Sequence, residues 1–124
     1  MTATQRQILR LERAQERNFN RRKLKPILEH FDPKFVGFSS TVHKRITGRR
    51  ALGKTFSYYL RQSPRLTYRI TQPRVQVFGA TAIASFYWKV RFNHSQALNG
   101  RGTHVYIKRG RRWKIVHEHF SRLS

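Results

Sequence analysis

The C-terminal part of the chain carries the feature that most restricts its fold. Two runs rich in β-branched and aromatic residues, 103–109 and 113–120, flank the polar turn Gly110-Arg111-Arg112. This pattern predicts a β-hairpin in which Gly110 adopts a positive φ at the bend. Strict alternation along the second run predicts two faces, one with Trp113, Ile115, His117, His119 and Ser121 and the other with Lys114, Val116, Glu118 and Phe120. The rest of the chain is expected to pack around this strand pair.

Helical periodicity precedes strand periodicity along the chain. Apolar residues at helical spacing predict helices over 4–20, 23–31 and 48–62, and Glu12 and Glu16 are expected to pair with Arg13 or Arg17 on the surface of the first. Alternating patterns predict strands over 35–38, 41–46, 66–71, 74–78, 81–92, 102–109 and 113–121, with a mobile loop at Asn93–Asn99. Helices followed by a meander indicate one α+β domain over 1–124, in which three N-terminal helices pack on a curved antiparallel sheet.

The composition excludes several classes of protein. The 124 residues include no cysteine, so neither a disulfide framework nor a thiolate metal site can form. No apolar run approaches the roughly 20 residues that span a bilayer, and the N-terminus lacks the apolar segment of a signal peptide. We expect a cytoplasmic domain that does not insert into membranes and uses no cofactor.

The net charge is extreme and is spread along the chain. Twenty-seven Lys and Arg against five Asp and Glu give a charge of +22. Two interpretations compete: a natural nucleic-acid-binding protein, and an ordinary domain whose surface was deliberately made cationic. Local rules favour the second interpretation. Arg49 and Arg50 begin a helix where acids are preferred, and Ala80, Arg111 and Arg112 occupy turns that favour Asp, Asn or Gly.

On either interpretation, the exposed cations should bind polyanions, including nucleic acid and anionic proteins, without specificity and in a salt-dependent way. The expected contacts are Arg21, Arg22, Lys23, Arg49, Arg50, Arg109, Arg111 and Arg112.

Five short sequence segments and their spacing resemble the nuclear transport factor 2-like superfamily. They are Asp32-Pro-Lys-Phe-Val-Gly-Phe38, Ile46-Thr-Gly48, Gln72-Pro-Arg-Val-Gln-Val-Phe-Gly79, Ala82–Arg91 and Trp113–Ser121. Within this superfamily, the chain resembles SnoaL-like proteins and the association (hub) domain of calcium/calmodulin-dependent protein kinase II. This resemblance implies a cone with a pocket between sheet and helices, and a homo-oligomer, either a dimer or a larger ring. It predicts the fold better than the activity, because this fold hosts many functions.

The resemblance also implies which residues line the pocket: Phe35, Phe38, Phe56, Tyr59, Trp88, Lys89, His104 and Tyr106. In the kinase hub, arginines of the cavity hold small anions, whereas the corresponding positions here carry Gly53, Lys89 and His104. This difference argues against the binding of acidic metabolites. Isomerases and dehydratases of the superfamily use an Asp, or an Asp–His pair, but the one Asp of this chain, Asp32, is assigned to a turn before Pro33.

Four residues are candidates for acid–base catalysis: Glu118, His104, His117 and His119. A carboxyl group in an apolar cavity can act as a general acid or base. The alternative for Glu118 is a structural role, satisfied by an Arg, a backbone amide or Tyr106. His117 and His119 share a strand face and could bind a metal with His104, but no carboxylate or Cys completes the set, and no metal site is predicted.

These observations leave three functional hypotheses. The leading one is a non-catalytic, self-associating scaffold with an engineered cationic surface. The second is a SnoaL-like isomerase, cyclase or dehydratase that uses a pocket Glu or His, and the third is a natural nucleic-acid-binding protein. A cavity in which Glu118 and a histidine lie within hydrogen-bond reach would favour the enzyme, whereas an exposed or Arg-neutralised Glu118 would argue against it.

Overall fold

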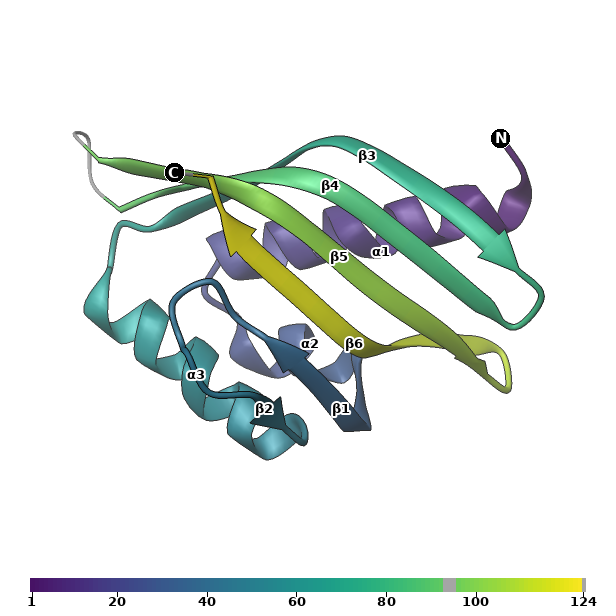
Figure 1. Cartoon of the computed structure of the whole chain (residues 1–124), viewed down its shortest axis with the longest axis horizontal. Coiled ribbons are helices and arrows are strands. Elements are labelled where there is room, and N and C mark those ends of the chain that lie inside the picture. Colours follow the sequence, from purple (N-terminus) through teal and green to yellow (C-terminus); the bar gives the residue numbers. More distant parts are fainter. Residues whose placement is uncertain (93–95, 124) are drawn as a thin grey trace.

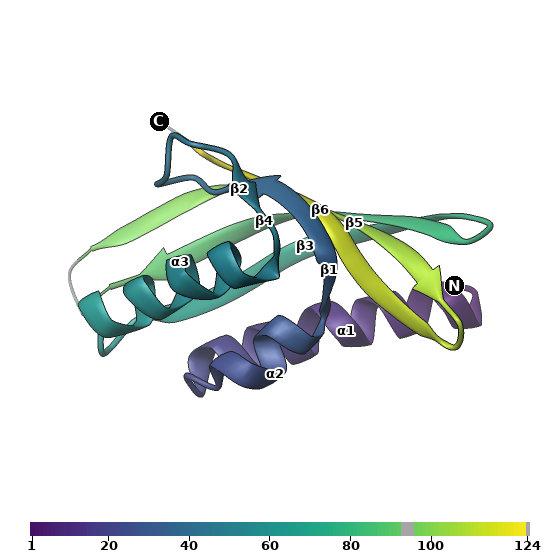
Figure 2. The same ribbon diagram turned by 90° about the horizontal axis from the view of Figure 1, so that it is seen from below.

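The structure, a computed structural model, describes residues 1–92 and 96–123. The helices are α1 (Ala3–Asn20), α2 (Leu24–Glu29) and α3 (Arg49–Gln62), and the strands are β1 (Phe31–Phe38), β2 (Ile46–Thr47), β3 (Thr67–Phe78), β4 (Thr81–Arg91), β5 (Ala97–Arg109) and β6 (Arg112–Arg122). The three helices cover the concave side of a curved sheet (Figure 1, Figure 2). The α+β architecture predicted from the sequence is therefore confirmed.

The sheet has six strands in the order β2-β1-β6-β5-β4-β3. Strands β3 to β6 form the predicted antiparallel meander, and Gly110 adopts a φ of 61° in the β5–β6 turn. The β1 strand runs parallel to β6, so the sheet is mixed rather than antiparallel. Tight hairpins impose antiparallel pairing only on consecutive strands, and β1 and β6 are joined through the whole intervening chain.

Two β-bulges change which side chains face the helices. In β6, Tyr106 pairs with Ile115 while Val105 pairs with His117, so Val116 has no partner. The extra residue reverses the alternation, and Glu118 consequently faces the same concave side as Ile115. The strict alternation predicted for this strand is therefore wrong beyond Ile115. In β3, the two strands predicted on either side of Pro73 form one continuous strand. Its pairing with β4 is irregular near Gln72, whose φ is 51°.

Other boundaries also differ from the sequence prediction. The second helix ends at Glu29, because Phe31 already begins β1. The strand predicted over 41–46 is reduced to Ile46–Thr47, and the hydroxyl groups of Ser39 and Thr41 instead hydrogen-bond to Tyr59. Of the predicted loop Asn93–Asn99, residues 97–99 belong to β5, and 93–95 lie outside the described residues.

Two apolar clusters fill the cone. The larger one contains Ile8, Phe35, Leu52 and Ile115, whereas Leu66, Tyr68, Ile70, Phe86 and Trp88 form the smaller one towards its other end. Gly100 and Gly102 pair with Trp88 and Phe86, and a Cβ atom at these glycines would lie 2.2 Å and 2.5 Å from the two rings. The glycines thus let both rings lie across β5 and shape the interior. Among the described helices, none is long and apolar enough to cross a membrane.

Candidate functional site

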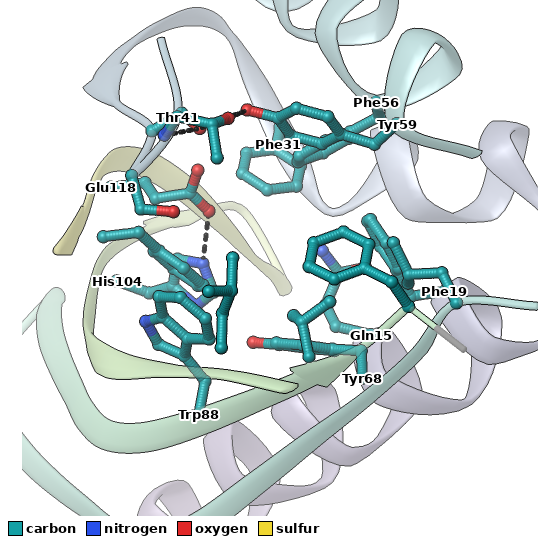
Figure 3. A pocket seen from close by; sticks show the side chains of 17 residues that line it. Gln15, Phe19, Phe31, Thr41, Phe56, Tyr59, Tyr68, Trp88, His104 and Glu118 are labelled. Atoms are coloured by element: carbon teal, nitrogen blue, oxygen red, sulfur yellow. Dashed lines mark hydrogen bonds and ion pairs between the residues drawn. The ribbon is translucent and has the colours of Figure 1, made fainter. Parts of the chain in front are cut away.

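A cavity of about 120 Å³ opens into the cone between the smaller apolar cluster, α1 and α3. Most of its wall is aromatic or aliphatic, and the residues that line it are Gln15, Phe19, Phe31, Ser39, Ser40, Thr41, Phe56, Tyr59, Leu66, Tyr68, Trp88, Val90, Phe92, Leu98, His104, Glu118 and Phe120. Figure 3 shows Glu118, His104 and Trp88 along one wall, with Phe19, Gln15 and Tyr68 across from them. An apolar cavity with a few convergent polar groups is the usual form of a small-molecule site.

The polar wall is a buried network centred on His104. Its Nδ1 atom lies 2.7 Å from Glu12 Oε2, and its Nε2 atom lies 2.7 Å from Glu118 Oε1. The Tyr106 hydroxyl donates a further hydrogen bond of 2.7 Å to Glu12 Oε2. The exposed fractions of Glu12, His104 and Glu118 are 0%, 2% and 5%. One imidazole ring is therefore held between two carboxyl groups, of which only Glu118 lines the cavity.

The network keeps His104 protonated. Burial by itself lowers the pKa of an imidazole, but the negative charge of Glu12 and the hydrogen bonds to Glu118 and Glu12 outweigh it and raise the pKa of His104 to about 10. An imidazolium ion donates from both ring nitrogens, so both carboxyl groups accept. His104 therefore fixes the Glu118 side chain through Oε1 and leaves the second carboxyl oxygen for other contacts.

Tyr68 provides a neutral hydroxyl group on the opposite wall. Burial, followed by the charges of Glu12, Glu118 and Glu16, raises the pKa of Tyr68 well above its ordinary value, so the hydroxyl stays protonated. Within the part of the chain that the structure describes, no hydrogen bond fixes this hydroxyl. The cavity thus offers a carboxyl acceptor on one side and a hydroxyl donor on the other.

Half of the predicted pocket residues face this cavity. Phe56, Tyr59, Trp88 and His104 line it. Phe35 lies in the larger core cluster, and Tyr106 is buried behind His104, where it binds Glu12. Lys89 is exposed on the convex face because it alternates with the inward-facing Trp88, and Phe38 contacts the rings of His117 and His119 outside the cavity.

The four candidate acid–base residues separate into two pairs. His104 and Glu118 come together inside the cone. His117 pairs with Val105 and His119 with Thr103 on the convex face, and the bulge at Val116 is the reason that Glu118 does not follow them. The three histidines therefore do not converge on one metal position. Glu118 is satisfied by a histidine rather than by an Arg, a backbone amide or Tyr106.

The sequence prediction missed two residues of the site, Tyr68 and Glu12, and it placed Glu12 on the helix surface. The spacing of Glu12 does carry a signal, because Ile8, Glu12, Gln15 and Phe19 follow one another at three- and four-residue intervals and so share the apolar stripe of α1. Glu16 does pair with Arg13, as predicted. In the described structure, Oε1 of Glu12 and Oε1 of Gln15 are buried without a hydrogen-bond partner. Such unsatisfied atoms are rare in cores that serve only packing.

The cations predicted to contact polyanions do not form one patch. Arg21, Lys23, Arg50, Arg111 and Arg112 are exposed at three separate places: the end of α1, the start of α3 and the β5–β6 turn. Three others have intramolecular partners: Arg22 donates to the carbonyl groups of Leu60 and Ser63, Arg49 to that of Phe31, and Arg109 to Asp32. Asp32 lies in β1 rather than in a turn, and this ion pair lowers its pKa despite the opposing effect of burial.

The fold and cavity define a class of protein, the NTF2-like cones. A protein of unknown function from Pseudomonas putida KT2440 with an NTF2-like fold superposes with a TM-score of 0.91 at 21% identity, covering 98% of this chain and 87% of that one. The SnoaL-like domain model matches residues 13–123, and the chain belongs to that family. Comparison with curated protein sequences gave no match.

Two further structures differ in the role assigned to them. A candidate dehydratase of the NTF2-like family from Streptomyces avermitilis has a TM-score of 0.83 at 13% identity, covering 96% of both chains. A candidate calcium/calmodulin-dependent protein kinase II association domain from Xanthomonas campestris has a TM-score of 0.83 at 16% identity, covering 95% of this chain and 86% of that one. Both share the cone, so the choice between enzyme and scaffold depends on the site of this chain.

Proposed function

We propose that the protein is a small-molecule enzyme of the isomerase, cyclase or dehydratase kind, with Glu118 as its acid–base group. The observation that carries this proposal is the Glu118–His104 pair, joined at 2.7 Å on the wall of an apolar cavity. A scaffold needs no ionisable group facing an internal cavity, whereas proton transfer requires one. The role of scaffold stays a prediction, as does the deliberate modification of the surface.

The reaction that fits the cavity is proton transfer at carbon beside a carbonyl group. The Glu118 carboxylate takes a proton from the substrate carbon, which leaves an enolate, and the Tyr68 hydroxyl donates a hydrogen bond to the developing oxyanion. Glu118 then returns the proton to a different atom, or to a leaving hydroxyl group, which departs as water. His104 is a positioning residue in this scheme, because it holds Glu118 in place without touching the substrate.

The wall composition suggests the substrate class. The rings of Phe19, Phe56 and Trp88 favour a flat, mostly apolar molecule. An acidic substrate is disfavoured, because His104, the one basic residue among those that line the cavity in the described chain, is already neutralised by two carboxyl groups. We therefore expect a neutral cyclic ketone or hydroxyketone.

Solvent exchange tests the proposal without knowledge of the product. The protein is incubated with 2-tetralone in D₂O, and loss of the α-proton signals is followed by NMR against a protein-free sample. We expect catalysed exchange that Glu118→Gln abolishes and Glu29→Gln, the same change at an exposed position, leaves intact. Undiminished exchange in Glu118→Gln would refute the assigned base, and no exchange across a panel of cyclic ketones would refute the reaction class.

Binding is measured separately from exchange. Trp88 lines the cavity and Trp113 lies in the larger core cluster, and these are the two tryptophans of the chain. In a Trp113→Phe background, the fluorescence of Trp88 reports occupancy of the cavity alone. We expect Glu118→Gln to retain binding of 2-tetralone, because the substitution removes the base and keeps the shape.

A further inference from the structure

The convex face of the sheet carries a compact block of cations at the end where β4 finishes and β5 begins. In the strand register, Arg69 lies opposite Lys89, and Arg91 lies two residues further along β4 on the same face, opposite Thr67. Tyr87 lies between Thr71 and Arg101 in the adjacent row. These side chains alternate with the buried residues Tyr68, Ile70, Phe86 and Trp88, so they project away from the cone. We call Arg69, Tyr87, Lys89, Arg91 and Arg101 the outer block.

Among the residues that the structure describes, no acidic side chain neutralises the charges of the outer block. Like charges placed directly opposite each other across a strand pair, as Arg69 and Lys89 are, destabilise a sheet. No ion pair joins these cations to an acid within the part of the chain that the structure describes. The ion pairs of that part belong to Glu12, Glu118, Glu16 and Asp32, with partners elsewhere. An anion that lies over these cations would offset their mutual repulsion.

The outer block also contains an exposed aromatic ring. The exposed fraction of Tyr87 is 46%, which is large for an aromatic residue in the middle of a four-stranded meander. A groove follows this part of the face and is lined by Arg69, Tyr87, Lys89 and Arg91 of the block together with the polar residues Thr67, Thr71 and Asn99. Neighbouring side chains on a sheet face lie about 5 Å apart across strands and about 7 Å apart along a strand. Cations and ring therefore share one small surface.

We propose that the outer block binds single-stranded nucleic acid. Cations that surround an exposed ring on a sheet face fit a chain of phosphates whose unpaired bases can stack, whereas the bases of a duplex are already stacked on one another. Duplex DNA and anionic proteins would use the charge but not the ring. The proposal is independent of the internal cavity, because the block lies on the opposite face of the sheet.

The test compares two double variants that remove the same charge. Arg69→Gln with Lys89→Gln alters the outer block, and Arg111→Gln with Arg112→Gln alters the exposed β5–β6 turn. Binding of fluorescein-labelled dT20 is measured by fluorescence anisotropy at several salt concentrations. We expect the outer-block variant to lose about tenfold or more in affinity and to show a smaller salt slope than the turn variant. Equal losses in the two variants would overturn the proposal in favour of a uniform cationic coat.

Tyr87→Ala tests whether bases are contacted. Removing a stacking ring is expected to weaken dT20 binding by about five- to a hundredfold. Binding of inorganic polyphosphate, which has no bases, should not change. If dT20 and polyphosphate respond alike, or if a 20-base-pair duplex binds the unaltered protein more tightly than dT20 does, the surface is not a single-strand site. Thermal unfolding checks that each variant stays folded, which is expected because all the substituted side chains are exposed.

Discussion

His104 and Glu118 face each other directly across the β5–β6 hairpin, and His104 Nε2 lies 2.7 Å from Glu118 Oε1. This contact depends on the bulge at Val116, because without the extra residue the Glu118 side chain would project from the convex face. The α1 helix then supplies Glu12 to the other ring nitrogen. The β5–β6 hairpin and the helix α1, which is distant in sequence, thus enclose one protonated imidazole.

The protonation of His104 is the most direct prediction from this geometry. The pKa of His104 is about 10, so we expect its ring to be an imidazolium at neutral pH, whereas an ordinary histidine, with a pKa of 6.5, is mostly neutral there. A ¹³C NMR titration of the His104 Cε1 signal checks this value. A transition of His104 near pH 6.5 would show that the two carboxyl groups do not hold the proton.

The same shift predicts how stability depends on pH. The pKa of His104 is higher in the folded than in the unfolded chain, so its contribution is complete below about pH 6.5 and is lost as pH rises through about 10. We expect the free energy of unfolding, measured with urea, to fall over this range. Glu118→Gln removes the negative charge of one of the two carboxylates that raise this pKa, so the fall should be smaller in that variant. An equal fall in both proteins would assign the effect to other groups.

The two carboxyl groups should differ in their importance for stability. Glu12 is fully buried and accepts from both His104 and Tyr106, whereas Glu118 borders the cavity and binds His104 alone. Breaking a buried ionic pair costs about 3–5 kcal/mol, so we expect Glu12→Gln to approach this range and Glu118→Gln to cost less. Urea unfolding at pH 7 measures both, with the exposed Glu29→Gln as the control. A larger loss in Glu118→Gln would contradict the order of burial.

The sequence predicted the architecture well because the architecture depends on regular signals. The helical stripe of α1, the turn at Gly110 and the alternation along β4 all follow from local periodicity. The site was predicted only in part, because it depends on interruptions of that periodicity. The segment Ile-Val-His-Glu has no residue that signals a bulge at Val116. This bulge determines that the side chain of Glu118, rather than that of His117, points into the cone. Likewise, Lys89 was placed in the pocket although its neighbour Trp88 occupies the inward position.

Gly100 should be sensitive to a single added methyl group. A Cβ atom added at Gly100 would lie 2.1 Å from the backbone oxygen of Ser121 and 2.2 Å from the Trp88 ring. To make room, β5 and β6 would have to separate or Trp88 would have to leave the cavity wall. We expect Gly100→Ala to lower the free energy of unfolding by about 1–3 kcal/mol, as overpacking does, and to shift the emission of Trp88. Gly53→Ala provides a contrast. Its Cβ atom would meet only the flexible end of Leu28 at 3.0 Å, and alanine favours the helix by up to about 1 kcal/mol.

The distribution of apolar and cationic residues on the convex face leads to a prediction of how the chain self-associates. At the end away from the outer block, Ile83 pairs with Val105, Val105 with His117, and His117 with Val36. A half-buried row thus crosses four strands and is apolar on three of them. We expect a dimer through this half of the face, where Ile83, Val105 and Val36 are the apolar residues, since the cationic half would repel its own copy. Light scattering coupled to gel filtration should give twice the 14.9 kDa of one chain, and more completely at high salt, where repulsion is screened. Val105→Lys should yield monomers, whereas Thr67→Lys at the cationic end should not. A single-chain mass at every salt concentration would refute self-association, and a mass well above two chains would indicate a ring instead.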